Sequence, residues 1–219
     1  MIIVIDGPAG SGKSSTAKAI ANRLGIQFLD SGALYRAVTL LWLDHNKPDN
    51  SFFDQLKTFT ISFEYRNKAF SVAIDGEDVS RKIRDQLVAE NVSRIASNPK
   101  VREYVNELMR KATDDQVCIA DGRDLGTAVF PDADLKFFMV ASIDVRAERR
   151  YKEMKEQGQD VSLAEIKANI ANRDEADSGR EHDPLARAHD AIEIDTSGKT
   201  FDEQVDHMIS IIKEKLNKT

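Results

Sequence analysis

Cysteine is nearly absent from this chain of 219 residues, which contains Cys118 and no second cysteine. A single thiol excludes a disulfide within the chain, and it excludes a zinc site built on several cysteines. The four histidines, His45, His182, His189 and His207, show no metal-ligand spacing. We therefore expect a fold without disulfides, with a reducing cytoplasm as its natural compartment.

Long apolar runs and an excess of positive charge are missing as well. The apolar start at residues 1–5 stops at Asp6 and Gly7, so it is too short to span a membrane, and it lacks the basic region of a signal peptide. A net charge of −6 argues against a broad nucleic-acid-binding surface. The chain also shows no coiled-coil heptads. We expect a monomer with neither membrane nor nucleic-acid partners.

The beginning of the chain has the pattern of a strand, a glycine-rich loop and a helix. Apolar residues make up 41% of the chain, enough for one large α/β domain with its own core. Ile2–Ile5 is a continuous β-branched run, as in a parallel strand covered on both faces. From Ser14 to Leu24 the apolar residues follow a helical spacing, and Gly25 is typical of a helix end.

The loop between them matches the phosphate-binding pattern G-x-x-x-x-G-K-[ST]. Its glycines permit backbone angles at which successive amides point inward and form a nest for an anion. The helix that follows adds its positive end, Lys13 reaches the β- and γ-phosphates, and the Ser14 hydroxyl can ligate Mg²⁺. We expect the triphosphate of ATP to lie on Gly7, Pro8, Ala9, Gly10, Ser11, Gly12, Lys13, Ser14 and Ser15. The dinucleotide fingerprint G-x-G-x-x-G fits this glycine spacing poorly.

A small antiparallel insertion is predicted at about residues 57–90. Residues 59–65 and 69–74 both alternate apolar and polar side chains, and residues 66–68 between them suit a turn. This pair interrupts a chain that otherwise alternates strands and helices. Further strands are expected at residues 117–120, 135–140 and 191–194, with helices at residues 88–112, broken at Pro99, and 201–216. The charge-dense stretch at about residues 158–188 has the composition of a solvated, mobile helical segment.

Four further segments, at residues 29–36, 99–102, 119–127 and 173–180, carry a resemblance to a known family. Together with the phosphate loop they closely resemble bacterial cytidylate kinases, which phosphorylate CMP and dCMP with ATP. The resemblance covers essentially the whole chain, including the β-rich insertion. It implies an α/β P-loop core at residues 1–56 and 91–219, with a parallel sheet flanked by helices. It also implies a CMP-binding insertion at residues 57–90 and a mobile helical lid at about residues 158–188.

The family pattern assigns roles to individual residues of this chain. By resemblance, Ser31, Tyr35 and Arg36 belong to the monophosphate site, and Arg36 holds the acceptor phosphate. The base-reading positions are Ser93, Arg102 and Asp124, and Asp177 matches the position that binds the sugar hydroxyls. The transferring phosphoryl group is expected among Lys13, Arg123, Arg173 and Arg180. Ala176 stands where the family's lid usually carries a further arginine.

The chemistry of cytosine makes sense of two of these positions. Its exocyclic amine is a donor that a carboxylate such as Asp124 accepts, and its ring acceptors suit the guanidinium of Arg102. Arg123 follows a buried strand, at the end of the sheet where ligands bind in open α/β folds. Arg173 and Arg180 lie in the mobile segment, from which they can close over ATP and expel water.

Each assignment has an alternative in the residues themselves. These are a surface ion pair for Arg36, a pair on the helix surface for Arg102, a capping role for Asp124 and plain core for Tyr35. Asp121 either holds the metal through water or caps the turn, and the lid arginines are otherwise solvated. Residues 196–199 lie near the adenine or form a plain turn.

The sequence also admits other functions. One is a P-loop kinase for another small acceptor, such as UMP, AMP or shikimate. Another is a nucleotide-dependent switch of the GTPase type, which needs a guanine-reading N-K-x-D segment. A third is a silent nucleotide-binding module.

Overall fold

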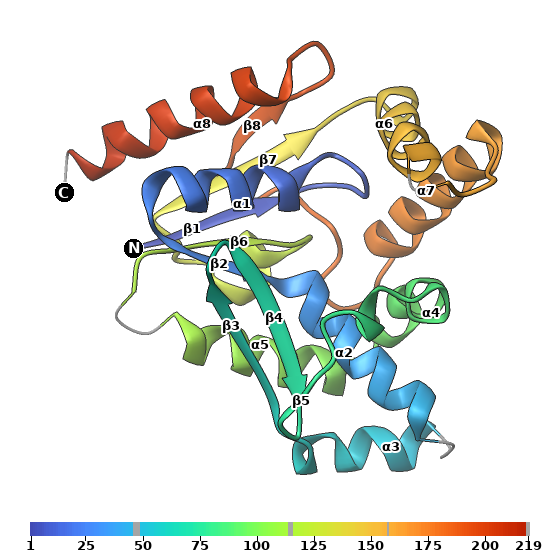
Figure 1. Cartoon of the computed structure of the whole chain (residues 1–219). Coiled ribbons are helices and arrows are strands. Elements are labelled where there is room, and N and C mark those ends of the chain that lie inside the picture. Colours follow the sequence, from blue (N-terminus) through green and yellow to red (C-terminus); the bar gives the residue numbers. More distant parts are fainter. Residues whose placement is uncertain (46–48, 114–115, 157, 218–219) are drawn as a thin grey trace.

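A parallel sheet of five strands forms the centre of the computed structural model, which describes residues 1–45, 49–113, 116–156 and 158–217. The strand order is β2-β6-β1-β7-β8, and every pairing in this sheet is parallel. Figure 1 shows these strands crossing the upper half of the molecule. Their bounds are β1 Ile2–Asp6, β2 Gln27–Asp30, β6 Cys118–Asp121, β7 Leu135–Val140 and β8 Ile192–Asp195. This confirms the predicted parallel α/β core.

The central strand β1 is covered on both faces, as its unbroken apolar run predicts. Ile3 and Ile5 pack with α1 (Lys13–Leu24) and α8 (Phe201–Leu216). Val4, which points the other way, packs with α2 (Ser31–Asp44), α4 (Gln86–Ala96) and α5 (Pro99–Ala112). All three side chains are fully buried. Strand alternation therefore divides the core into two layers and fixes which helices lie on each face.

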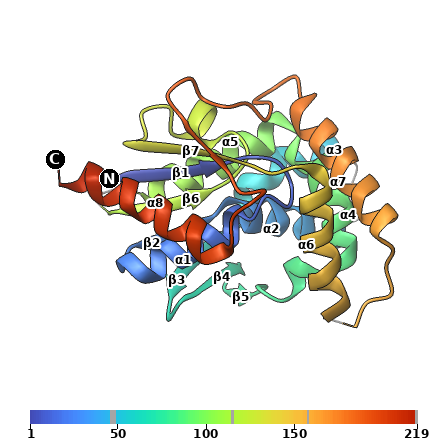
Figure 2. The same cartoon turned by 90° about the horizontal axis from the view of Figure 1, so that it is seen from above.

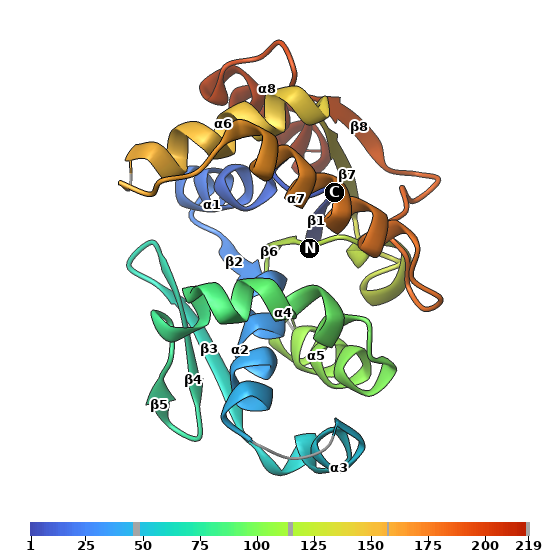
Figure 3. The same cartoon turned by 90° about the vertical axis from the view of Figure 1, so that its right-hand side faces the viewer.

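The predicted antiparallel insertion is present as a second, separate sheet. It consists of β3 (Ile61–Arg66), β4 (Ala69–Ile74) and the short β5 (Glu77–Asp78). Asn67 and Lys68 at the hairpin turn have φ values of 52° and 64°, as a two-residue turn between right-twisted strands requires. Figures 1 and 3 show this sheet beside α2, below the main sheet.

Three short elements next to the insertion were not predicted. Helix α3 (Asp49–Gln55) and the 3₁₀ turn Leu56–Thr58 lead into the insertion. A second 3₁₀ turn, Lys82–Arg84, leads out of it to α4. The predicted helix start at Pro99 is confirmed, because the side chain of Asn98 accepts from the amide of Lys100 and caps α5.

Two helices of the C-terminal third lie side by side at the edge of the molecule (Figures 2 and 3). They are α6 (Ile143–Glu156) and α7 (Leu163–Ser178). Ala147, Ile166 and Ile170 form a small core between them. Helix α7 begins with a complete capping box between Ser162 and Glu165. Among the described residues, no helix is long and apolar enough to cross a membrane.

Candidate active site

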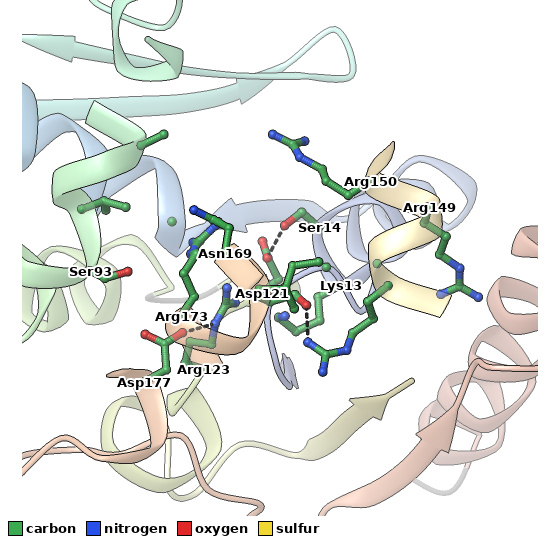
Figure 4. Close-up of a pocket in the computed structure, with 18 of the residues that line it drawn as sticks. Lys13, Ser14, Ser93, Asp121, Arg123, Arg149, Arg150, Asn169, Arg173 and Asp177 are labelled. Atoms are coloured by element: carbon green, nitrogen blue, oxygen red, sulfur yellow. Dashed lines mark hydrogen bonds and ion pairs between the residues drawn. The ribbon is translucent and has the colours of Figure 1, made fainter. Parts of the chain in front are cut away.

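A cavity of about 1400 Å³ lies at the carboxyl ends of β1, β2 and β6, and the α6–α7 pair, α2 and α4 also line it. Most of the residues predicted for the site line this one cavity. They are Ala9, Gly10, Gly12, Lys13, Ser14, Ser15, Ser31, Tyr35, Arg36, Ser93, Arg123, Asp124, Arg173, Asp177 and Arg180. Figure 4 shows how side chains from the phosphate loop, β6, α6 and α7 converge there.

The phosphate loop has the backbone geometry that its glycines predict. Gly12 has a φ of 90° at the start of α1. A Cβ on Gly7 would lie 2.1 Å from the carbonyl oxygen of Met139, so only glycine fits against β7 at this position. The loop is therefore fixed both by its own turns and by its packing on the neighbouring strand.

Lys13 is buried at the base of this loop, and no carboxylate of the described residues is in direct contact with it. Its Nζ donates to the Pro8 carbonyl oxygen at 2.7 Å and to Ser11 Oγ at 3.3 Å. Burial, followed by the positive charge of Arg123, holds the pKa of Lys13 well below its usual range. An anion in the cavity would relieve both effects, because it restores an opposite charge beside the ammonium group.

Ser14 and Asp121 place oxygen atoms beside the loop, as the dashed line in Figure 4 shows. Ser14 Oγ donates to Asp121 Oδ2 at 2.5 Å. The second oxygen, Asp121 Oδ1, is buried and has no hydrogen-bond partner within the described part of the chain. Burial and the nearby charge of Asp30 raise the pKa of Asp121 to about 7. A hydroxyl and an unpartnered carboxylate oxygen form a donor set that suits a hard cation.

The predicted monophosphate residues come from the start of α2. Asp30 caps this helix by accepting from the amide of Ala33 at 2.9 Å. Ser31 Oγ donates to the carbonyl oxygen of Asp121 at 2.6 Å, which ties α2 to β6. The alternative surface ion pair of Arg36 is not found among the described residues, and the nearby Asp30 pairs with Arg84 at 3.2 Å.

Arg36 faces the cavity among other cations. Burial and the charge of Arg173 lower the pKa of Arg36 to about 10. A guanidinium that is buried beside like charges gains most from an anionic ligand. The position of Arg36 is therefore that of a residue suited to hold a phosphate.

The predicted base-reading residues are divided between two cavities. Asp124 and Ser93 line the large cavity. Arg102 instead lines a smaller, adjoining cavity of about 530 Å³. Its Nη2 donates to Asp124 Oδ2, and both side chains are almost fully buried. The alternative of a pair on the helix surface does not apply to Arg102, because its side chain is buried. The alternative of a capping role does not apply to Asp124, because its side chain makes no capping hydrogen bond.

Burial is also the main reason that the pKa of Asp124 rises to about 7. The positive charge of Arg102 acts in the opposite direction, and the charges of Asp6 and Asp183 add to the rise. The Asp124 carboxyl therefore changes its ionisation near neutral pH, at the wall of the large cavity.

Three arginines and Asp177 gather on the other side of the cavity. Asp177 accepts from Arg123 Nε at 2.9 Å, and its other oxygen accepts from Arg180 Nη2. The Nε atoms of Arg173 and Arg180 are buried without a partner in the described chain. Burial and the charge of Arg123 lower the pKa of Arg173. The predicted sugar-binding carboxylate thus holds two of the predicted catalytic arginines, and the cluster has more cations than anions.

Helix α6 adds cations that the sequence interpretation missed. Arg146, Arg149 and Arg150 line the cavity, and their spacing of three and four residues places them on one helix face. Arg146 Nη1 donates to the Ala9 carbonyl oxygen at 2.7 Å and to Asp174 at 2.6 Å. The i, i+3, i+4 spacing is visible in the sequence and was the available signal.

Asp174 on α7 also occupies part of the phosphate loop. Its Oδ1 accepts from the amide of Ala9 at 2.9 Å. This carboxylate takes one of the loop amides that the predicted nest offers to a phosphate. An anion can bind that amide only when the Asp174 side chain leaves it.

A second missed carboxylate, Asp6, joins the phosphate loop to the segment that carries Arg123 and Asp124. Asp6 Oδ1 accepts from the amide of Leu125 at 2.9 Å, and Oδ2 accepts from the amide of Gly126 at 2.7 Å. These bonds hold the start of the π-helical turn Leu125–Val129. The last residue of β1 thereby fixes the segment that carries Asp124.

Two sequence alternatives can now be placed. The N-K-x-D pattern required for a GTPase-type switch does occur, at residues 46–49, of which residues 46–48 lie outside the described structure. Asp49 begins α3, and no described residue of α3 lines the large cavity. Of residues 196–199, Lys199 lines the cavity, and Thr196 accepts from Arg149 at 3.1 Å. That segment therefore contacts the cavity from the α6 side.

Comparison with known proteins identifies relatives by sequence and further proteins that share the fold. The family model described as cytidylate kinase matches residues 3–214. A cytidylate kinase of Geobacter sulfurreducens is 44% identical over 218 residues, 98% of this chain and 94% of that protein. One of Clostridioides difficile is 42% identical over 215 residues, 97% and 98% of the two chains. The crystal structure of a shikimate kinase from Bacteroides thetaiotaomicron has a TM-score of 0.50 at 13% identity, covering 99% of this chain and 98% of its own. That structure is similar in fold alone.

Proposed function

The chain belongs to the cytidylate kinase family, and on this basis we propose that it transfers the γ-phosphoryl group of ATP to CMP or dCMP, giving ADP and CDP or dCDP. One structural observation supports this activity independently of the family match. The phosphate loop, a cluster of arginines and a carboxylate suited to a cytosine amine all face a single cavity. A cavity of this kind accommodates two nucleotides with their phosphates directed toward each other.

The donor nucleotide is proposed to bind at the loop that ends in Lys13 and Ser14. Its phosphates accept hydrogen bonds from the loop amides and from the helix end, and Lys13 supplies a point charge at the β- and γ-phosphates. The phosphates displace Asp174 from the amide of Ala9. Displacement of Asp174 frees α7 from the loop and gives the proposed lid at residues 158–188 a reason to move when ATP binds.

The acceptor nucleotide is proposed to bind between α2 and α4. Arg36 holds its phosphate, Tyr35 and Ser31 form the adjacent wall, and Ser93 and Asp124 face the base. Asp124 accepts from the exocyclic amine of cytosine, a donor that uracil lacks. Arg102 holds Asp124 from behind, where the two side chains are in contact. The β-rich insertion at residues 57–90 is proposed to complete this half of the site.

Phosphoryl transfer needs charge neutralisation and alignment, and no side chain has to act as a nucleophile. A phosphate oxygen of CMP attacks the γ-phosphorus in line, and the β-phosphate oxygen of ADP leaves. Lys13, Arg123, Arg173 and Arg180 are proposed to stabilise the transferring group. The unpartnered Nε atoms of Arg173 and Arg180 are available for its oxygens, and Asp177 is proposed to bind the acceptor sugar.

Magnesium is proposed to accompany ATP at Ser14. The hydroxyl of Ser14 and the unpartnered oxygen of Asp121 fit this ion, with phosphate oxygens and water completing its shell. The described residues contain no group of three or more His, Cys, Asp or Glu side chains suited to a metal, so the site depends on the nucleotide. When bound, the ion neutralises charge on the β- and γ-phosphates.

A panel of acceptors tests the proposed function. The enzyme with ATP and Mg²⁺ is assayed for formation of the diphosphate from CMP, dCMP, UMP, AMP and shikimate. We expect turnover with CMP and dCMP and much slower turnover with the others. A preference for UMP, AMP or shikimate would replace the proposal with the alternative small-molecule kinase. A lack of turnover with every acceptor would support a silent binding module.

A further inference from the structure

Asp183 lies outside the residues assigned to the site, on the segment between α7 and β8, and it contacts Arg102. Its Oδ2 accepts from Arg102 Nε at 2.8 Å across 81 positions of sequence. Its backbone φ is 49°, an uncommon value for a residue other than glycine. The inference that follows rests on the proposed function, because it concerns the end of the site where the acceptor base is recognised.

The guanidinium of Arg102 is held at all three of its nitrogens. Nε donates to Asp183, Nη1 donates to the Ala96 carbonyl oxygen at 3.3 Å, and Nη2 donates to Asp124. The bond at Nε fixes the orientation of the guanidinium plane. Arginine carries five N–H donors, so one N–H on each terminal nitrogen takes no part in these three bonds. Asp183 therefore determines how Arg102 is presented to Asp124.

Electrostatics explains why a second carboxylate is needed there. Arg102 lies in the first turn of α5, where the helix dipole disfavours a cation. Burial alone lowers the pKa of Arg102, but Tyr35, Asp124 and Asp183 outweigh it and raise that pKa above its ordinary value. Near neutral pH, Asp124 is an incomplete counter-ion because its own pKa is about 7. Asp183 keeps 36% of its side chain exposed, so it provides a negative charge at little desolvation cost.

The segment that carries Asp183 is tied to the end of the lid helix α7. The amide of Leu185 donates to the Asp177 carbonyl oxygen at 2.8 Å, and Arg180 pairs with the Asp177 carboxylate. Asp183 lies between these two attachments. The lid segment and the base-recognition pair are therefore in direct contact through one carboxylate.

We propose that Asp183 is a positioning residue for recognition of the acceptor base. It fixes the guanidinium of Arg102, which in turn holds Asp124 at the wall of the large cavity. Arg102 thus acts as the link between a lid-side carboxylate and a cavity-side carboxylate.

The principal test compares Asp183→Asn with the unmodified enzyme. The variant replaces the carboxylate with an amide that accepts more weakly from a guanidinium. We expect the KM for CMP to rise about tenfold, with kcat and the KM for ATP changed less than about twofold. At pH 8, where Asp124 is a carboxylate in both enzymes, the preference for CMP over UMP, as the ratio of kcat/KM, falls by a similar factor. Asp183→Glu keeps the charge and is expected to restore much of both quantities.

A matched control separates this effect from a general loss of charge. Glu181→Gln removes one negative charge two residues away, at an exposed position of the same segment. It is expected to leave the KM for CMP unchanged. Thermal unfolding of both variants is measured as well, and we expect their midpoints to agree.

The pH dependence of base preference provides a readout that a purely structural role would not move. The charged or titratable groups that interact electrostatically with Asp124 are Asp6, Asp183, Arg102, Arg180 and Tyr35. In Asp183→Asn the negative charge near Asp124 is lost, which lowers the pKa of Asp124. The ratio of kcat/KM for CMP over UMP is therefore expected to begin its rise at a lower pH than in the unmodified enzyme. Asp183→Glu keeps the original position. His182→Asn serves as a second control, because His182 lines the same smaller cavity.

Three results overturn the inference. An unchanged KM for CMP in Asp183→Asn would show that Asp183 is not needed for positioning. A lower KM would show that Asp183 restrains Arg102 instead of serving it. Equal losses for CMP and UMP with a lowered unfolding midpoint would indicate a structural role. Failure of the proposed function is distinct, since the unmodified enzyme would then not phosphorylate CMP at all.

Discussion

At the scale of single residues, Lys13 has the simplest expected consequence. In Lys13→Ala the charge at the β- and γ-phosphates is lost, while the acceptor side of the cavity is untouched. We expect kcat to fall by roughly 10²–10³, with the affinity for CMP changed less than about twofold. Single-turnover kinetics and CMP titration measure the two quantities. Lys18→Ala, at an exposed position of the same helix, is the matched control, and an unchanged rate in Lys13→Ala would refute the role of Lys13.

Asp124 predicts a pH-dependent choice between bases. Its pKa of about 7 lies above the ordinary value, so the group is a neutral acid below that pH and a carboxylate above it. The carboxylate accepts from the amine of cytosine, whereas the acid can donate to the carbonyl at the same position of uracil. The ratio of kcat/KM for CMP over UMP is therefore expected to rise between pH 6 and pH 8. The two phosphates titrate alike, so their effect cancels in the ratio.

Asp124→Asn tests the same group without a change of pH. The amide no longer titrates, so the ratio is expected to become flat across this range and to fall by about tenfold at pH 8. Equal losses of kcat/KM for CMP and UMP would contradict a role for Asp124 in reading the amine.

At the scale of elements, the insertion is attached to the core through its hairpin. Tyr65 Oη donates to Asn22 Oδ1 on α1 at 2.5 Å, and the ring packs edge-on against Phe28 of β2. Tyr65→Phe removes the hydrogen bond and keeps the ring. We expect a loss of about 1 kcal/mol in the free energy of unfolding, or roughly 2–4 °C in the midpoint.

A double-mutant cycle with Asn22→Ala isolates that bond. The two single losses should not add, because each substitution removes the same interaction. Additive losses would show that the pair contributes nothing. Tyr151→Phe on α6 is the control, since the described structure gives the Tyr151 hydroxyl no hydrogen bond.

The elements with long periodic patterns were predictable from the sequence. The bounds of β7 and α8 agree with the prediction, because a mostly apolar run specifies the first and a sustained helical face the second. Helix α3 was missed because seven residues are too few to show a helical period. The π-helical turn Leu125–Val129 was missed for another reason, since Asp6, about 120 positions away, holds its amides.

The candidate site likewise contains residues that were predictable from the sequence and contacts that were not. The residues of the phosphate loop were predictable because their motif is local in sequence. The position of Arg102 away from the large cavity was not, because it depends on Asp124 and Asp183 together. Likewise, the contact of Asp174 with the phosphate loop joins residues 165 positions apart, and no local pattern signals it.

At the scale of the whole molecule, ligand binding should be visible as stabilisation. A ligand at one hundred times its Kd adds about 2.7 kcal/mol to the free energy of unfolding, or roughly 5–10 °C in the midpoint for a chain of this size. We expect CMP alone and MgATP alone each to raise the midpoint. With both halves in one cavity, a non-hydrolysable ATP analogue with CMP should raise it further than either alone. A midpoint insensitive to CMP would argue against the acceptor half of the site.

Sedimentation tests the proposed monomer. For a monomer, sedimentation velocity is expected to give one species at every protein concentration, and activity is expected to stay proportional to enzyme concentration. A loss of specific activity on dilution would show that a second copy completes the site.

The parallel order of the central sheet has a consequence for biosynthesis. Strand β1 and the phosphate loop after it leave the ribosome before the two neighbours of β1 in the sheet, which begin at Cys118 and Leu135. A nascent chain shorter than these positions has no partner for the backbone of β1 and no carbonyl of Met139 against which Gly7 can pack. The motif that is easiest to find in the sequence is thus among the last parts to acquire its structure during translation.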